Sequence, residues 1–206
     1  MTQIKICGIT NLKDALLACE YGADAVGFVF AKSPRRISVK AAASICSRLP
    51  CSVSSVGVFV DQSADIINNA VKKCGLDYVQ LHGDESPAFC KKIKAPVIKS
   101  FRVKGAVALA EIKKYKVAAI LLDSFSPASH GGTGKTFDWK AAVRAKKAGI
   151  PLILSGGLNA GNLASAIKKV RPRAVDVSSG VEVRPGKKSA VKMKKAIAIV
   201  RRGCII

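Results

Sequence analysis

The stretch Ala118-Ala119-Ile120-Leu121-Leu122-Asp123 is an apolar run that ends in a carboxylate. An amphipathic segment from Asp138 to Lys147 follows it, and a second apolar run, Pro151 to Leu154, comes next. A short apolar run without alternation is typical of a strand buried on both faces, as in a parallel sheet covered by helices. The stretch therefore predicts a strand, a loop, a helix and a second strand, with Asp123 at the carboxyl end of the first strand.

The same unit repeats from one end of the chain to the other. Each predicted strand is followed by a helical pattern, and such a repeat is typical of a closed (β/α)8 TIM barrel in the α/β class. No G-x-G-x-x-G follows the first strand, which argues against an open dinucleotide-binding sheet. We expect a single domain over residues 1–206, with strands at Ile4–Cys7, Ala25–Phe30, Val53–Val60, Tyr78–Leu81, Val97–Ser100, Ala118–Asp123, Pro151–Leu154 and Ala174–Val177.

The loop after Asp123 is long and rich in glycine. Gly134-Lys135-Thr136 matches the end of a P-loop, but the first P-loop glycine would fall on Ser129, where the chain lacks the backbone freedom of glycine. A nucleotide-phosphate loop is therefore disfavoured. We expect instead an active-site lid that begins at Asp123. Elsewhere, Asp61 is expected to cap the helix that runs through Lys73.

The chain is strongly basic, with 35 Lys and Arg against 13 Asp and Glu and a net charge of +22. This balance favours anionic partners. The basic residues are dispersed and aromatic stacking platforms are few, so a specific nucleic-acid partner is not expected. A small phosphorylated substrate is the expected partner.

Other sequence features limit where the protein is located and which cofactors it could hold. No apolar run reaches the roughly 20 residues of a membrane span, and no secretory signal opens the chain, so a cytoplasmic protein without a membrane partner is expected. Seven cysteines without a CxxC pair and only two histidines predict reduced, packed thiols and no metal site.

A barrel carries its chemistry at the carboxyl ends of its strands. Cys7 ends the first strand, and Lys5 shares its face because side chains alternate along a strand. A lysine beneath a thiol favours the thiolate, so Cys7 is a candidate general base, although a packed thiol is the alternative. Asp123 could act as the general acid, or merely cap its loop. A base and an acid over one cavity predict isomerase chemistry.

Two further strand ends offer backbone N–H groups where barrels commonly hold phosphate. They are Ser155-Gly156-Gly157 and Ser178-Ser179-Gly180, and two ordinary turns are the alternative. Arg35 and Arg36 could each bind a carboxylate or a phosphate through two N–H groups. Spacing alone does not say which of the two arginines does so.

Nine segments together resemble the phosphoribosylanthranilate isomerase family of tryptophan biosynthesis. They run through nearly the whole chain, with one at the end of almost every predicted strand. The segments are Lys5–Thr10, Gly27–Phe30, Ser33–Ser38, Val56–Phe59, Val79–Glu85, Leu122–Ser124, Gly131–Trp139, Leu154–Leu158 and Asp176–Glu182.

The resemblance implies the Amadori rearrangement of N-(5-phosphoribosyl)anthranilate to 1-(2-carboxyphenylamino)-1-deoxyribulose 5-phosphate, without cofactor or metal. It implies that Asp123 protonates the ribose ring oxygen, that Cys7 takes the C2′ proton and that Arg36 binds the anthranilate carboxylate. The resemblance further assigns phosphate binding to Gly156, Gly157, Ser179 and Gly180, and a place in the pocket wall to His82 and Asp176.

One departure from the family and two alternatives remain at this point. Ser189 stands where the family usually has an aspartate, and serine can replace it as a helix N-cap. A related barrel such as indole-glycerol-phosphate synthase would need Lys and Glu pairs instead of Cys and Asp. A nucleic-acid-binding protein is the other alternative. Its affinity for nucleic acid would fall steeply with salt concentration and would persist in a Cys7→Ala variant. The sequence allows a monomer or a homodimer.

Overall fold

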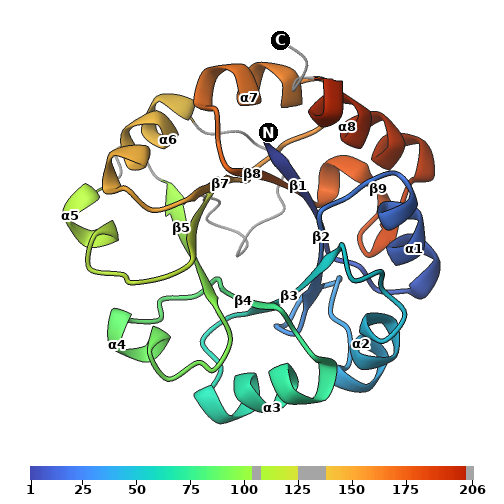
Figure 1. Ribbon diagram of the computed structural model, residues 1–206, viewed down its shortest axis with the longest axis horizontal. Coiled ribbons are helices and arrows are strands. Elements are labelled where there is room, and N and C mark those ends of the chain that lie inside the picture. The colour runs from blue at the N-terminus through green and yellow to red at the C-terminus, as the bar shows by residue number, and fades with distance from the viewer. Residues whose placement is uncertain (104–107, 125–137, 203–206) are drawn as a thin grey trace.

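The computed structural model describes residues 1–103, 108–124 and 138–202. Eight parallel strands close into a barrel in chain order, β1 to β8 (Figure 1), so the predicted (β/α)8 fold is confirmed. The expected lid and the rejected P-loop candidate at 134–136 lie in residues 125–137, outside the described residues. The strands are β1 Gln3–Cys7, β2 Ala25–Val29, β3 Ser54–Phe59, β4 Tyr78–Leu81, β5 Val97–Val103, β6 Ala119–Ser124, β7 Leu152–Leu154 and β8 Ala174–Val177.

Helices form a ring around the barrel (Figure 1). Two short antiparallel strands, β9 Glu182–Arg184 and β10 Lys187–Lys188, form a separate sheet that the sequence did not predict, because they are very short and largely charged. The helices are α1 Leu12–Glu20, α2 Val39–Cys46, α3 Ala64–Cys74, α4 Pro87–Cys90, α5 Leu109–Ile112, α6 Trp139–Ala145, α7 Leu163–Val170 and α8 Ala190–Arg202, with 3-10 turns η1 Lys146–Ala148 and η2 Ser179–Val181.

Side-chain caps begin most of these helices. Asn11 and Ser38 accept hydrogen bonds from the first turns of α1 and α2, as expected. Ser189 does the same for α8, where its Oγ accepts from Lys192 N. The expectation for Asp61 was wrong: Ser63 caps α3, and Asp61 takes a positive φ of 49°. A residue in that conformation cannot be an N-cap, which needs extended backbone.

The barrel interior changes character along its axis. Its apolar cluster consists of Val56, Ile98, Ala119, Leu121, Ile153 and Ala174. Because side chains alternate, the next residue on the same face of β6 is Asp123, on β7 Ser155 and on β8 Asp176. The amino-terminal half of the barrel interior is therefore filled by packed apolar side chains, and the carboxyl-terminal half is lined by polar groups. A second, larger core packs the outer faces of the strands against the helices.

Within the described ranges, none of the helices combines the length and the apolar character that crossing a membrane requires.

Candidate active site

A cavity of about 810 Å³ opens at the carboxyl ends of the strands. Such a volume is in the range of small-molecule sites. Residues from the ends of seven strands, β1 to β4 and β6 to β8, meet in its wall, which spans 178 positions of the sequence, from residue 7 to residue 185. The predicted site residues in this wall are Cys7, His82, Asp123, Gly156, Gly157, Asp176 and Ser179.

Cys7 ends β1 and is buried, with 7% of its surface exposed. Burial raises the pKa of its thiol, and the charge of Lys5, which lowers it, does not offset that effect. The expectation that Lys5 would bring this thiol toward the thiolate in the free protein was therefore wrong in its net direction. Desolvation of the charged form outweighs one neighbouring cation that is itself neutralised.

Lys5 lies inside the barrel, and its ammonium group contacts two polar side chains. Its Nζ is 2.9 Å from Asp176 Oδ1 on β8 and 3.0 Å from Gln80 Oε1 on β4. Burial lowers the pKa of Lys5, but Asp176 and Cys7 outweigh that effect and hold it above its ordinary value. Gly27 makes room for this side chain, because a Cβ there would lie 2.8 Å from Cys7 Sγ and 3.0 Å from Lys5 Cε.

Asp123 and His82 lie next to each other in the cavity wall. The distance from His82 Nε2 to Asp123 Oδ2 is 3.3 Å, and Nε2 makes no hydrogen bond with any described residue. Asp123 Oδ1 accepts from the backbone N–H of Ser124 at 2.8 Å. His82 Nδ1 lies 2.8 Å from Gln80 Nε2. A buried carboxyl and an imidazole are thus held side by side at one edge of the cavity.

The loops after β7 and β8 present backbone donors. The N–H groups of Gly156, Gly157, Ser179 and Gly180 make no hydrogen bond to another described residue. Gly156 and Gly157 have φ values of 87° and 63°, which favour glycine. A Cβ on Gly156 would also lie 2.6 Å from Ser124 N. Four unused donors from two adjacent loops, three of them in the cavity wall, suit an anion with several oxygens.

The structure distinguishes the two arginines that the sequence left equivalent. Arg35 is in the cavity wall and holds Glu182 through two groups, with Nε to Oε1 at 2.9 Å and Nη2 to Oε2 at 2.7 Å. Arg36 is exposed next to it, beside Val29 at the end of β2, and its side chain makes no ion pair with another described residue. Arg36 therefore retains its capacity to bind an added carboxylate.

Glu182 also binds Lys188, whose Nζ is 2.8 Å from Oε1. Burial opposes ionisation of Glu182, but Arg35 and Lys188 outweigh it and hold its pKa below the ordinary value. Burial lowers the pKa of Lys188, and Glu182 offsets only part of that effect. This cluster closes one side of the mouth.

The interpretation of the sequence missed Gln80 and the group around Glu182. The signal for Gln80 was present, because it stands two residues before His82 on the same strand face, as Lys5 stands before Cys7. Glu182 and Lys188 belong to the short sheet that had no recognisable pattern. Among the residues that the structure describes, no three His, Cys, Asp or Glu are grouped to hold a metal ion.

The chain was compared with known proteins. The model of a family described as N-(5'phosphoribosyl)anthranilate (PRA) isomerase matches residues 4–198. A protein named N-(5'-phosphoribosyl)anthranilate isomerase from Citrifermentans bemidjiense is 55% identical, with 100% of both chains covered. Its namesake from Geobacter sulfurreducens is 50% identical, over 96% of this chain and 97% of its own.

Solved structures are also similar. Phosphoribosyl anthranilate isomerase from Thermus thermophilus superposes with a TM-score of 0.91 at 38% identity, covering 98% of this chain and 99% of that one. A phosphoribosyl anthranilate isomerase in complex with reduced 1-(o-carboxyphenylamino)-1-deoxyribulose 5-phosphate gives a TM-score of 0.85 at 42% identity, covering 98% and 100%.

Proposed function

The chain belongs to the N-(5'-phosphoribosyl)anthranilate isomerase family, and from this premise we propose how its own residues carry out the reaction. It catalyses the Amadori rearrangement of N-(5-phosphoribosyl)anthranilate to 1-(2-carboxyphenylamino)-1-deoxyribulose 5-phosphate in tryptophan biosynthesis. The rearrangement needs one proton delivered to the ribose ring oxygen and one removed from C2′. An acid and a base must therefore act on one bound sugar.

We assign the acid to Asp123 and the base to Cys7. The single observation that carries this assignment is that both buried side chains line one cavity, from the ends of β6 and β1. Asp123 protonates the ring oxygen and opens the ring to a Schiff base. Cys7 then takes the C2′ proton to give an enolamine, which tautomerises to the ketone.

The protonation states of the two groups are linked. Burial keeps the Cys7 thiol neutral in the free protein, whereas the reacting enzyme needs a thiolate and a carboxylic acid. These two arrangements differ by one proton moved from Cys7 to Asp123, so the net charge of the site is unchanged. Lys5 stabilises the thiolate once it forms.

The remaining residues hold the two anionic ends of the substrate. Gly156, Gly157, Ser179 and Gly180 bind the phosphate through their unused N–H groups, and Arg36 binds the anthranilate carboxylate. Asp176 anchors Lys5 through Oδ1 and offers Oδ2 to a ribose hydroxyl. The complexed relative supports this arrangement, since the ligand in its name carries both a phosphate and a carboxylate.

The surroundings of the enzyme follow from the same premise. We place it in the cytoplasm as a monomer or a homodimer, and a relative from Thermotoga maritima is named as dimeric. Sedimentation of the purified chain distinguishes the two states. The charge of +22 attracts the anionic substrate.

The test follows the fluorescence of phosphoribosylanthranilate as the enzyme consumes it. Cys7→Ser and Asp123→Asn should each lower turnover at least ~100-fold, because each removes one proton-transfer group. Cys90→Ser is the matched control, since Cys90 is equally buried but lies outside the cavity wall. Near-normal turnover in both site variants would remove the assignment.

A further inference from the structure

Three side chains cross the barrel in a line behind the acid. Lys5 on β1 reaches Gln80 on β4, and these strands lie on opposite sides of the ring (Figure 1). Gln80 in turn contacts His82, whose ring faces Asp123. The contacts measure 3.0 Å from Lys5 Nζ to Gln80 Oε1 and 2.8 Å from Gln80 Nε2 to His82 Nδ1. Gln80 is 1% exposed although it is part of the cavity wall, so its amide is largely withdrawn from solvent.

Donor and acceptor chemistry determines the direction of each contact in this line. An ammonium group has only donors, so the atom of Gln80 that faces Lys5 must be the amide oxygen. The amide nitrogen then faces His82 and donates to Nδ1. A ring nitrogen that accepts carries no hydrogen, so the hydrogen of the neutral ring is on Nε2. That Nε2–H is the group 3.3 Å from Asp123 Oδ2.

We propose that Gln80 is a positioning residue that holds His82 as the neutral Nε2–H tautomer beside Asp123. The amide cannot accept a hydrogen on Nδ1 without losing Lys5, so the buried charge of Lys5 selects the state of a ring on the far side of the barrel. The catalytic meaning of this arrangement rests on the proposed role of Asp123 as acid.

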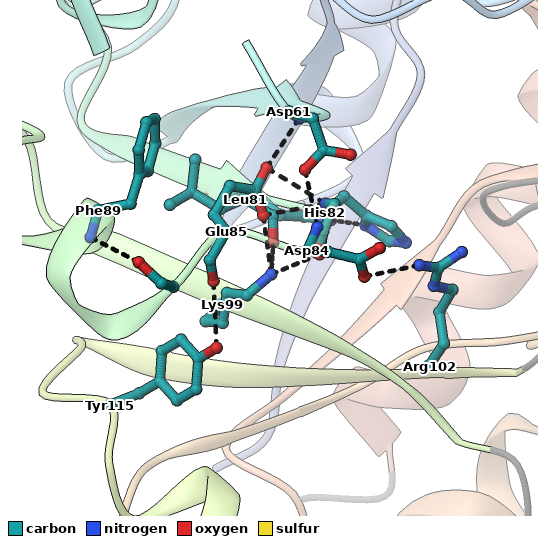
Figure 2. Close-up of polar contacts among 12 residues, drawn as sticks. Asp61, Leu81, His82, Asp84, Glu85, Phe89, Lys99, Arg102 and Tyr115 are labelled. Atoms are coloured by element: carbon teal, nitrogen blue, oxygen red, sulfur yellow. Dashed lines mark hydrogen bonds and ion pairs between the residues drawn. The ribbon is translucent and has the colours of Figure 1, made fainter. Parts of the chain in front are cut away.

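The backbone of His82 is fixed independently of its ring. His82 N donates to Phe59 O at 2.8 Å. The residues that follow are held by Glu85, which accepts from Gly83 N and is paired with the buried Lys99 (Figure 2). Contacts with β3 and β5 therefore fix the backbone around His82. They leave the rotation and the protonation state of its imidazole ring to be determined by other contacts. Gln80 is the described side chain that contacts Nδ1.

A neutral ring has a specific consequence for proton transfer. An imidazolium beside Asp123 would favour the carboxylate and oppose the protonated form that a general acid needs. A neutral Nε2–H leaves the acid form accessible and can donate to the carboxylate after the proton has left. Gln80 thus supports both halves of the step through His82.

Two-bond 15N–1H correlation spectra of the imidazole rings test the proposal at pH 7.5. The chain has only two histidines, so a His82→Asn variant assigns the signals, and His130 is the internal reference. We expect neutral Nε2–H for His82 in the wild-type protein and the imidazolium pattern in Gln80→Glu, where a carboxylate accepts the hydrogen of Nδ1. Gln80→Leu should give a mixture of ring states, with His130 unchanged.

An Nδ1–H or imidazolium pattern in the wild-type protein would overturn the proposal, and so would an unaltered His82 pattern in both variants. The wild-type spectrum decides the first point even if a variant does not fold. Turnover should fall about 10- to 100-fold in Gln80→Glu with little change in KM, as for partners that orient other site histidines. Gln3→Leu, on β1 at the opposite end of the barrel, is the control.

Failure of this proposal and failure of the proposed function are distinguishable. Full activity in Cys7→Ser and Asp123→Asn would remove the acid and base assignments but leave the spectra as expected. Spectra that show another tautomer of His82 would reject the positioning role of Gln80 and leave the acid and base assignments unaffected.

Discussion

Two buried lysines of the barrel make similar ion pairs for different purposes. Lys5 binds Asp176 at 2.9 Å and Lys99 binds Glu85 at 2.8 Å, and all four side chains are at most 6% exposed. Lys5 also donates to the side chain of Gln80, whereas Lys99 also donates to the backbone carbonyls of Gly83 and Leu81. Lys5 therefore positions side chains inside the barrel, whereas Lys99 holds the backbone of the loop after β4.

Their carboxylate partners differ in the same way. Among the described residues, Asp176 accepts only from Lys5 and also lines the cavity. Glu85 lies between Asp61 and Lys99 (Figure 2) and accepts from the backbone N–H groups of Asp61 and Gly83 as well. An ion pair whose carboxylate also satisfies backbone donors is structural, whereas one that leaves an oxygen facing a cavity can serve a substrate.

The largest expected effect is on stability. Lys5→Met and Lys99→Met should each lower the free energy of unfolding by about 3–5 kcal/mol, because each leaves a carboxylate buried without its cation. Urea denaturation measures this loss. Equal stability of either variant and the wild-type protein would show that its pair is not needed for the fold.

Double variants separate the two pairs. Lys5→Met with Asp176→Leu should regain most of the loss, since an apolar pair can replace a buried ion pair. Lys99→Met with Glu85→Leu should stay at least about 1–3 kcal/mol less stable, because the N–H groups of Asp61 and Gly83 lose their acceptor. The opposite order of recovery would contradict the comparison.

Activity should separate the lysines more sharply than stability does. At a temperature where both variants are folded, we expect Lys5→Met to lower turnover roughly 100-fold, because the thiolate loses its cation and Gln80 loses its anchor. Lys99→Met should act only through the loop and cost less than about tenfold. Similar losses in both, by the fluorescence assay, would show that Lys5 has no chemical role beyond packing.

Titration of the Cys7 thiol sharpens the contrast further. Burial and Asp176 raise the pKa of this thiol, whereas Lys5 and, to a smaller extent, Lys188 lower it. Removal of Lys5 therefore takes away the larger lowering effect. The difference in thiolate absorbance between wild-type protein and Cys7→Ser isolates this thiol from the other six cysteines. Its midpoint should rise in Lys5→Met and stay unchanged in Lys99→Met. A downward movement in Lys5→Met would contradict the sign.

The smallest effect is expected at the exposed end of the same network. Asp84 pairs with Arg102 at 2.9 Å, but the carboxylate side chain is 84% exposed (Figure 2). Asp84→Asn should change the free energy of unfolding by no more than about 1 kcal/mol and leave turnover intact, because water screens the pair. A loss as large as that of Lys99→Met would show that burial is not what separates these pairs.

Much of the fold could be read from local patterns. The runs that became β4 and β8 were predicted to the residue, since an apolar run between helices leaves few alternatives. β5 extends to Val103, three residues past its predicted end, because Phe101 and Arg102 pair with β6 although their side chains are partly exposed. Pairing with a neighbouring strand is a tertiary contact that local hydropathy does not record.

The candidate site was predictable to the extent that strand ends converge. Cys7, His82, Asp123, the Arg35-Arg36 pair and the two glycine loops follow from that rule. The resemblance to a family added Asp176 and the expected roles of Arg36 and His82. Spacing alone could not separate the roles of Arg35 and Arg36, because the partner of Arg35 is Glu182, 147 positions away. The net direction of the Cys7 pKa was missed because burial is a property of the closed barrel.

By itself, the sequence determined the order of strands and helices and the polar residues that end the strands, since both follow from short-range periodicity. Only the tertiary structure decided which charges neutralise one another inside the barrel, which arginine stays available and which way an amide faces. Those outcomes depend on distances across the barrel, where low polarity makes every unpaired donor or charge costly, and such distances exist only once the ring of strands has closed.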